Sequence, residues 1–201
     1  MGSRRIPAAA AAAPALFVAI VTILTAHEWD FLHRLGWKLW GKTDVPWPSA
    51  TSLGSWGWLQ ILNFIQLGAA VLALTVTMRA FLPPGRAARL GRWALTVAGL
   101  ALLGLGFKTD PTTTIKTWHG GIHAMSFIVL VLSGLVAMLA IWRSRWPGLS
   151  GASLALAIFA LAATLVSFAW ASASTVIGGL SLLALLVWIA LLALAVRAAA
   201  R

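Results

Sequence analysis

The sequence predicts an all-α, polytopic membrane protein, built as one bundle of six transmembrane helices with both termini in the cytoplasm. Hydrophobic residues make up 61% of the chain and charged residues 9%. The mean hydropathy is +0.93, and this composition leaves too little polar surface for a soluble globule of this size. Six stretches approach the roughly 20 apolar residues that a helix needs to cross a bilayer, and basic residues gather in alternate connections between them.

We expect these helices, in a single domain of residues 1–201, at about 7–26, 56–82, 91–107, 118–142, 149–171 and 176–197. Arg4 and Arg5 before the first stretch could instead mark a cleaved signal peptide. The apolar run is too long for that, and Leu24 is bulky where a cleavage site needs a small residue. We therefore expect a retained first helix.

The orientation follows from the 15 Lys and Arg residues, because cationic segments near helix ends tend to stay in the cytoplasm. Ten lie in segments that we assign to the cytoplasm: Arg4, Arg5, Arg79, Arg86, Arg89, Arg92, Arg143, Arg145, Arg197 and Arg201. Five lie on the outer side: Arg34, Lys38, Lys42, Lys108 and Lys116. We expect a multi-pass protein of the cell membrane with its polar site outside the cytoplasm, because every acid and histidine lies there: Glu28, Asp30, Asp44, Asp110, His27, His33, His119 and His123.

The net charge of +11 would suggest nucleic-acid binding in a soluble protein. Here the arginines are spread along short loops at helix ends, where anionic lipid headgroups satisfy them. We therefore expect membrane lipids as partners and no nucleic acid, and six helices would suffice for a homo-oligomer. The sequence contains no cysteine, which excludes disulfides, thiolate nucleophiles and iron–sulfur sites.

The first outer loop, about residues 27–55, is long enough to be either functional or disordered, and it is too aromatic for disorder. We expect it to lie on the bilayer surface or to fold over the bundle. Eight of the twelve tryptophans lie at or near the outer face: Trp29, Trp37, Trp40, Trp47, Trp56, Trp58, Trp118 and Trp170. They form either an interfacial belt alone or a belt together with an aromatic pocket. In the second case Trp29, Trp58 and Trp118 are candidate substrate-binding residues.

The densest polar constellation lies at residues 107–123, between the third and fourth helices on the outer side. His119 and His123 are four residues apart, so on a helix they face nearly the same way. Polar groups that face lipid are costly, so we expect this stripe to face the bundle interior. Further candidates to line such a site are Ser126, Gln60 and Asn63.

Three uses of these residues remain open. His119 and His123, with Asp110 or an acid of the first outer loop as a further ligand, could hold zinc and leave a position open for water. Alternatively, a protonated Asp110 or Glu28 in a dry, tryptophan-lined pocket could protonate an alkene or an epoxide. In the third case Asp110 only caps a short helix that has Pro111 at its first position.

These segments resemble the family catalogued as domain of unknown function 998, bacterial and archaeal membrane proteins with six predicted helices. The resemblance covers about residues 50–140 and is carried by Ser52–Gly54, Gly57–Phe64 with Gly68, Phe107–Pro111 and His119–His123. The chain departs from the family at Lys108, where members tend to carry proline. More distant six-helix relatives are associated with lipid handling, so the resemblance implies a lipid-linked function.

We therefore expect an outward-facing Asp/His/Trp pocket that acts on a lipid or another membrane-soluble substrate, such as a prenyl compound. The chemistry would be acid–base or metal-assisted, in a lipid hydrolase or an acid-initiated cyclase. The candidate catalytic residues are Asp110, His119, His123 and Glu28. The alternative is a non-catalytic protein that binds lipid or transports a small molecule, with or without coupling to protons.

Overall fold

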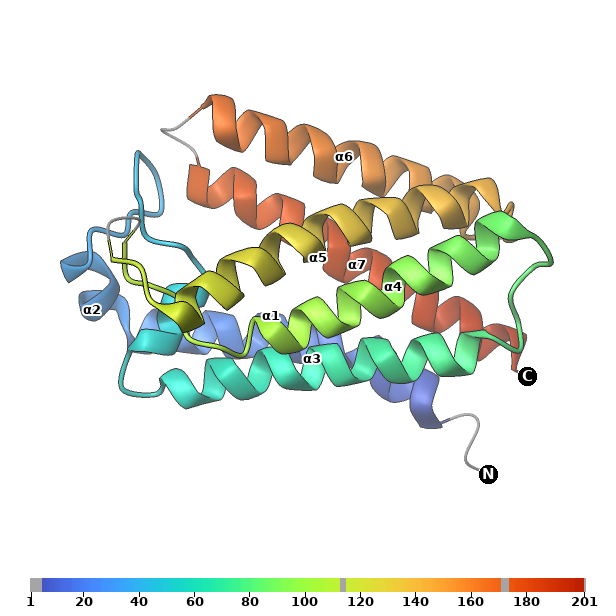
Figure 1. The fold of residues 1–201 in the computed structure, drawn as a ribbon, viewed down its shortest axis with the longest axis horizontal. Helices are drawn as coiled ribbons and strands as arrows, with labels where there is room; N and C mark the ends of the chain where they lie inside the picture. Colours follow the sequence, from blue (N-terminus) through green and yellow to red (C-terminus); the bar gives the residue numbers. More distant parts are fainter. Residues whose placement is uncertain (1–4, 113–114, 171–173, 201) are drawn as a thin grey trace.

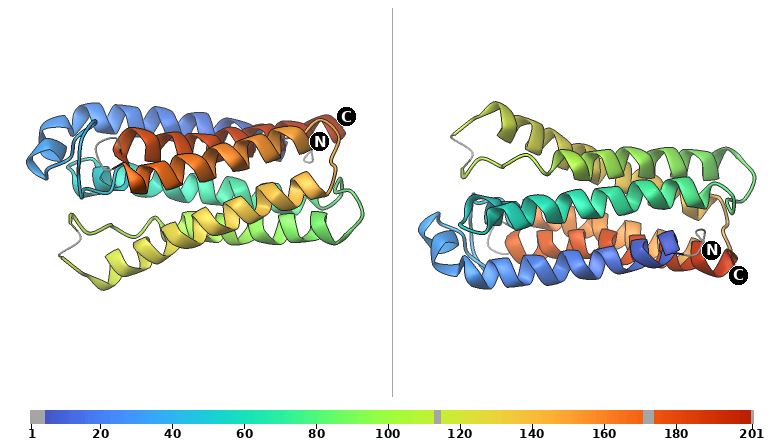
Figure 2. Two further views of the ribbon diagram at one scale, coloured as in Figure 1. Left: turned by 90° about the horizontal axis from the view of Figure 1, so that it is seen from above. Right: turned by 90° about the horizontal axis from the view of Figure 1, so that it is seen from below.

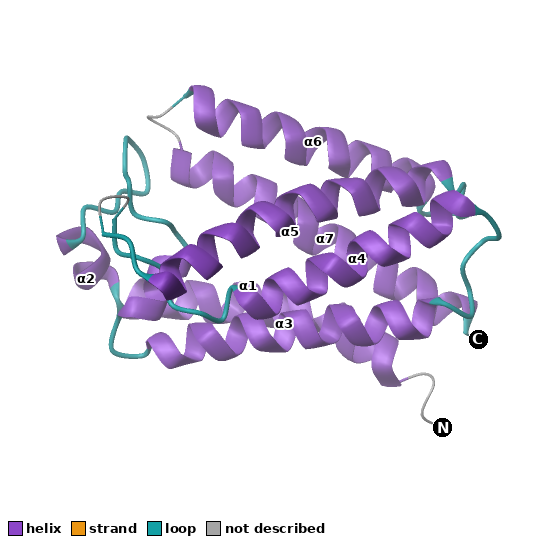
Figure 3. Ribbon diagram, viewed as in Figure 1, coloured by secondary structure: helices purple, strands orange, loops and turns teal. Residues whose placement is uncertain are grey.

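The computed structural model describes residues 5–112, 115–170 and 174–200, and over these residues the protein is all-helical, without a strand (Figures 1 and 3). The long helices are α1 (Arg5–His27), α3 (Gly57–Met78), α4 (Arg86–Gly104), α5 (Trp118–Arg143), α6 (Ser150–Ala169) and α7 (Ser174–Ala199). Two short helices lie between α1 and α3: α2 (Trp29–Arg34) and the 3-10 helix η2 (Ser49–Leu53).

Each of the six predicted stretches overlaps one long helix, and the differences lie at the ends. α3 ends at Met78 rather than near residue 82, ahead of Pro83 and Pro84, which disfavour helix in the residues before them. α4 begins at Arg86 instead of residue 91, because its arginine-rich first turn is helical without being apolar. Residue 171, the predicted end of the fifth helix, lies outside the described residues.

Five of the long helices are long and apolar enough to cross a membrane: Ile6–His27, Gly57–Met78, Trp118–Arg143, Ser150–Ser167 and Thr175–Ala199. The fold is therefore that of a multi-pass helical membrane protein. α4 differs because Arg86, Arg89 and Arg92 occupy its first two turns.

The six long helices form a closed ring in the order α1, α3, α4, α5, α6, α7 (Figure 2). Its core contains fully buried side chains such as Phe17, Leu74 and Trp188. The outside is apolar as well: Val76 is 74% exposed and Leu132 60%. Apolar side chains on the outer face are what contact with lipid requires.

The two ends of the bundle differ. The start of α1, the end of α7 and the α3–α4 and α5–α6 turns lie at one end, which we call the terminus end (Figure 1). Residues 28–56 cover the other end, and we call this segment the cap. The α4–α5 connection also lies at the cap end.

The cap has a small hydrophobic core of its own, formed by Leu32, Trp37, Val45 and Ala50. The indole of Trp47 donates a hydrogen bond to the Thr25 hydroxyl of α1 at 3.0 Å. Trp40 meets Trp170, at the end of α6, edge-on with ring centroids 6.3 Å apart. The cap therefore folds over the bundle rather than extending away from it.

Candidate functional site

The predicted catalytic residues fall into three polar groups at the cap end: the Glu28 network, the Asp110 network and the Ser49–His123 pair. The Glu28 network and the Ser49–His123 pair connect segments that are distant in the sequence, whereas the Asp110 network lies within the α4–α5 connection and the start of α5.

The Glu28 network joins the end of α1 to the start of α3. Glu28 is 6% exposed, and its Oε1 accepts hydrogen bonds from the Ser55 hydroxyl at 2.7 Å and the Trp56 N–H at 3.0 Å. A Cβ at Gly54 would overlap the carboxylate. Burial alone raises the pKa of Glu28. The Trp56 N–H, the Ser55 hydroxyl and nearby His27 outweigh burial, so the pKa lies below its ordinary value and the group is ionised at neutral pH.

The Asp110 network holds the first turn of α5. Thr117 is the N-cap residue: its Oγ1 accepts from the Gly120 N–H at 3.1 Å and donates to Asp110 Oδ1 at 2.6 Å. A Cβ at Gly120 would overlap the Asp110 carboxylate. The Thr117 hydroxyl is the largest influence on the pKa of Asp110 and lowers it; burial raises it. The Thr117 N–H and the charges of His119 and His123 lower it further, so the pKa lies below its ordinary value.

In the third interpretation Asp110 caps a short helix that begins at Pro111, but Pro111 and Thr112 lie in a bend, and residues 113–114 are outside the described residues. Asp110 instead orients the residue that caps α5. That role was not evident from the sequence, since Asp110 and Thr117 are seven residues apart.

His119 belongs to the Asp110 network. Its Nδ1 lies 2.9 Å from Thr117 Oγ1 and 3.1 Å from the Lys108 carbonyl oxygen. A carbonyl only accepts hydrogen bonds, and the Thr117 proton is directed at Asp110, so the Nδ1 of His119 carries the proton. The structure thus brings Asp110 and His119 into one network.

The Ser49–His123 pair joins the cap to α5. His123 is 4% exposed. Its Nδ1 lies 2.7 Å from the Phe107 carbonyl oxygen and must carry the proton. In the neutral ring Nε2 is therefore an acceptor, and the Ser49 hydroxyl donates to it at 2.9 Å. The sequence pointed to His123 but not to Ser49, because the two are 74 residues apart and Ser49 belongs to no motif.

Three buried side-chain polar atoms among the described residues have no hydrogen-bond partner: Trp37 Nε1 in the cap, Ser52 Oγ in η2 and Gln60 Nε2 in α3. Ser52 follows Ser49 by three residues in η2, and side chains with that spacing eclipse in a 3-10 helix. Gln60 lies one turn before Phe64, whose ring meets the His123 ring edge-on at 5.9 Å. The unpartnered atoms of Ser52 and Gln60 therefore lie on the sides of η2 and α3 that approach the pair.

The orientation of the Gln60 amide follows from its neighbour. Asn63 Nδ2 lies 3.0 Å from the Phe17 carbonyl oxygen, which fixes it as a donor, and 3.3 Å from Gln60 Oε1. The atom of Gln60 without a partner is therefore its NH₂ group. Gln60 and Asn63 are both fully buried, as the predicted inward-facing site requires.

The predicted zinc ligands do not fit a metal site. Among the described residues, no three His, Asp, Glu or Cys side chains are grouped so that they could hold a metal ion. His123 has a partner on each ring nitrogen, His119 uses Nδ1, and Thr117 donates to the Asp110 carboxylate. We therefore derive no chemistry from zinc.

The acid-initiated mechanism is not supported either. A carboxylic acid that protonates an alkene must be protonated in its dry site, which requires a raised pKa. Asp110 and Glu28 both have a lowered pKa.

The tryptophans form an exposed rim at the cap end instead of one pocket. At the cap end, six are more than two fifths exposed: Trp29, Trp40, Trp56, Trp58, Trp118 and Trp170. At the terminus end Trp93 is exposed as well. This arrangement favours the interfacial belt. Of the remaining predicted binding residues, Ser126 shares with Trp118 an open groove between α4 and α5.

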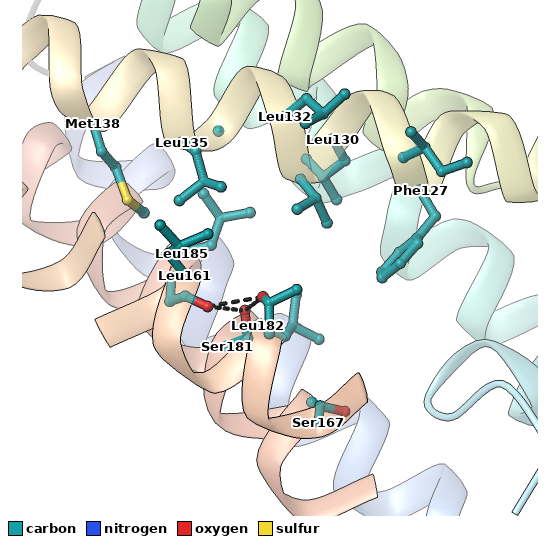
Figure 4. Close-up of a pocket in the computed structure, with 16 residues that line it drawn as sticks. Phe127, Leu130, Leu132, Leu135, Met138, Leu161, Ser167, Ser181, Leu182 and Leu185 are labelled. Atoms are coloured by element: carbon teal, nitrogen blue, oxygen red, sulfur yellow. Dashed lines mark hydrogen bonds between the residues drawn. The ribbon is translucent and has the colours of Figure 1, made fainter. Parts of the chain in front are cut away.

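A cavity of about 380 Å³ lies between α5, α6 and α7, within the usual size range of small-molecule sites. In Figure 4, Phe127 and Leu135 of α5 and Leu182 and Leu185 of α7 point toward it. Thr164 and Ser181, whose hydroxyls are 2.8 Å apart, supply polar atoms. The α6 and α7 residues that line it belong to the half of each helix nearer the cap. No sequence motif marks this cavity, because it arises from the spacing of three helices.

The comparison with protein families agrees with the resemblance seen in the sequence. A family described as "Protein of unknown function (DUF998)" matches residues 9–197, a range that includes most of α1 and α7 and everything between them. No curated protein and no solved structure matches the chain.

Proposed function

The chain belongs to the DUF998 family, and from that premise we propose that it is a six-span protein of the cell membrane that binds the hydrocarbon chain of a membrane lipid. The cavity between α5, α6 and α7 is the chain site. The cap lies outside the cytoplasm, and both termini lie inside. The described arginines support this orientation, because eight of them lie at the terminus end and one in the cap: Arg5, Arg79, Arg86, Arg89, Arg92, Arg143, Arg145 and Arg197 against Arg34.

Two properties of the cavity support the proposal: its position at the depth of the bilayer and its apolar lining. Its lining residues lie inside three candidate membrane spans. Phe127, Leu132 and Leu161 line it and are still 52%, 60% and 45% exposed, so it opens sideways toward lipid. An apolar cavity that opens at bilayer depth suits a hydrocarbon chain better than a water-soluble ligand.

α4 completes the six-span arrangement. It packs between α3 and α5 along the bundle, and its arginines lie in its first turns at the terminus end. There their side chains can reach the interface and contact anionic headgroups while the remainder of the helix lies in hydrocarbon.

Lipid retention by the purified protein tests the chain site. Leu135→Trp fills the cavity, whereas Leu139→Trp places the same side chain one turn away at a residue that does not line it. We expect native mass spectrometry to show bound lipid on the wild-type protein and on Leu139→Trp, and much less on Leu135→Trp. Equal lipid retention by a folded Leu135→Trp, or none by the wild type, contradicts the proposal.

The orientation can be tested separately, because the chain has no cysteine of its own. Lys42→Cys places a thiol in the cap and Arg143→Cys places one at the terminus end, both at exposed positions. In intact cells, a membrane-impermeant maleimide should label Lys42→Cys alone. Labelling of Arg143→Cys alone would reverse the orientation.

A further inference from the structure

We infer that Ser49 and His123 form a nucleophile–base pair that hydrolyses a carboxylic ester of the lipid bound in the α5–α6–α7 cavity. The inference rests on the proposed lipid-binding function and adds to it a reaction and a substrate class.

The geometry of the pair is that of an activated serine. The Ser49 hydroxyl points its proton at His123 Nε2, 2.9 Å away, and the opposite nitrogen of the ring donates to the Phe107 carbonyl at 2.7 Å. A nucleophile, a base within hydrogen-bond reach and a third group that orients the base are the parts that such catalysis needs. Here a backbone carbonyl takes the place of the usual carboxylate.

The unpartnered donors supply the next requirement, a place for negative charge on the carbonyl oxygen of the ester. Ser52 Oγ–H and the NH₂ of Gln60 are buried, lack a partner and lie on the elements that flank Ser49 and His123. A buried donor without a partner costs free energy, and such exceptions call for an explanation. An ester carbonyl oxygen that accepts hydrogen bonds from these two donors would explain why they lack a partner within the protein. The same donors would stabilise the oxyanion that forms during the reaction.

Neither Ser49 nor His123 lines the lipid cavity, but neighbouring residues on α5 and α7 connect the pair to its cap-side end. On α5, His123 and the cavity residue Phe127 are four apart, so they share a face and differ in height by about 6 Å. On α7, a Cβ at Gly179 would lie 3.2 Å from the ring of Trp47, two residues before Ser49, and Gly178 lines the cavity. A chain in the cavity would therefore place its polar end near Ser49, close to the membrane interface where the ester groups of lipids lie.

The reaction balances without a cofactor. Ser49 Oγ forms a bond to the ester carbonyl carbon while its proton moves to His123 Nε2. The bond from that carbon to the alcohol oxygen then breaks, and the alcohol leaves with the proton from His123. Water next attacks the acyl-serine as His123 takes one of its protons, and that proton returns to Ser49 as the fatty acid is released. His123 is positively charged while it holds the proton taken from Ser49 or from water. The ionised carboxylate of Asp110 stabilises that charge.

A serine-directed probe tests the pair on the full-length protein in lipid nanodiscs. We expect a long-chain alkyl fluorophosphonate to label Ser49, as located by peptide mass spectrometry. Ser49→Ala should abolish the label, and His123→Gln should slow labelling by about 100-fold or more. Ser144→Ala, whose serine caps α5 at the terminus end, should label at the wild-type rate.

An independent variant covers the case in which Ser49→Ala does not fold. Ser49→Cys introduces the only thiol of the chain, and its alkylation by iodoacetamide should slow at least 10-fold when His123→Gln is added, since the thiolate is the reactive form. Absence of label on wild-type Ser49, or rates indifferent to His123 in both assays, overturns the inference. If Ser49→Ala loses the label but keeps its bound lipid, the inference and the chain site both stand; loss of lipid binding in the wild type would instead remove the proposed function.

Discussion

The Glu28 and Asp110 networks differ from the Ser49–His123 pair in how completely the polar atoms beside them are satisfied. Each carboxylate accepts from one hydroxyl and one backbone N–H and lies against a glycine that leaves no room for a Cβ. The pair is instead flanked by two buried donors that have no partner. A satisfied network serves structure, whereas an unpaired buried donor calls for an explanation, of which a missing ligand is one. Charge drew attention to the carboxylates in the sequence, yet the chemistry is better placed at two neutral side chains.

The largest effect that tests this contrast is expected from Gln60→Leu. It removes an NH₂ group that has no partner and an oxygen that accepts from Asn63 Nδ2 at 3.3 Å. Asn63 Nδ2 keeps the Phe17 carbonyl as its acceptor, so the unfolding free energy should change by less than about 1 kcal/mol. Fluorophosphonate labelling of Ser49 should nevertheless fall by about 100-fold, the usual cost of losing an oxyanion donor.

The matched control for Gln60→Leu is Asn63→Leu, one turn deeper on α3. Asn63 donates to the Phe17 carbonyl and accepts from Gln66 at 3.2 Å, so its loss should lower the melting temperature. Wild-type labelling of a folded Gln60→Leu would show that this amide takes no part in the reaction.

Hydropathy and charge predicted the fold to within a few residues at most helix ends, because the bilayer imposes one length on every apolar span. The cap was harder. Its length and aromatic content marked the segment as ordered, but α2 and η2 are stabilised by Leu32, Trp37, Val45 and Ala50, which meet only after folding. No local pattern contains that information.

The site was predicted only in part, because its hydrogen-bond partners also come from other segments of the chain. The four-residue spacing of His119 and His123 placed both on one side of α5, but their partners come from elsewhere: Thr117 and Lys108 for one, Ser49 and Phe107 for the other. Thr117 had a usable signal, a threonine directly before an apolar helix. Ser49 had none.

Loss of the Glu28 carboxylate should give the next largest effect. Glu28→Ala leaves the Ser55 hydroxyl and the Trp56 N–H without their acceptor. The hydrogen bonds that connect the end of α1 to the start of α3 are then lost. Hydrogen bonds to a buried charged group are each worth about 1.5–3 kcal/mol, so the melting temperature should fall by several degrees. Asp30→Ala, an exposed acid two residues away, should leave it nearly unchanged. Equal melting temperatures for the two variants would show that Glu28 does not fasten the cap.

A smaller loss should follow from overpacking the Asp110 network. In Gly120→Ala the added methyl group would overlap the Asp110 carboxylate, which must move away from Thr117. Overpacking of this kind typically costs about 1–3 kcal/mol. At the adjacent Gly121 nothing lies within 4 Å of a Cβ, and alanine is a better helix former, so Gly121→Ala should be neutral or slightly stabilising. A melting temperature that falls equally in both variants would point to the helix turn itself rather than to the carboxylate.

The dependence of stability on pH should give the smallest effect. Folding lowers the pKa of Glu28 and Asp110 from their ordinary values of 4.5 and 3.8. The folded protein therefore binds these protons more weakly than the unfolded chain does, and the stabilisation is fully present at neutral pH. It should decline as the pH falls below about 4.5 and through the lowered values. Melting temperatures measured from pH 7 to pH 3 should show this decline, and Glu28→Gln, which cannot ionise, should reduce its slope. If Glu28→Gln kept the full dependence of melting temperature on pH, the Glu28 carboxylate would not be the acceptor that holds the cap. The contrast between a structural Glu28 network and a reactive Ser49–His123 pair would then fail.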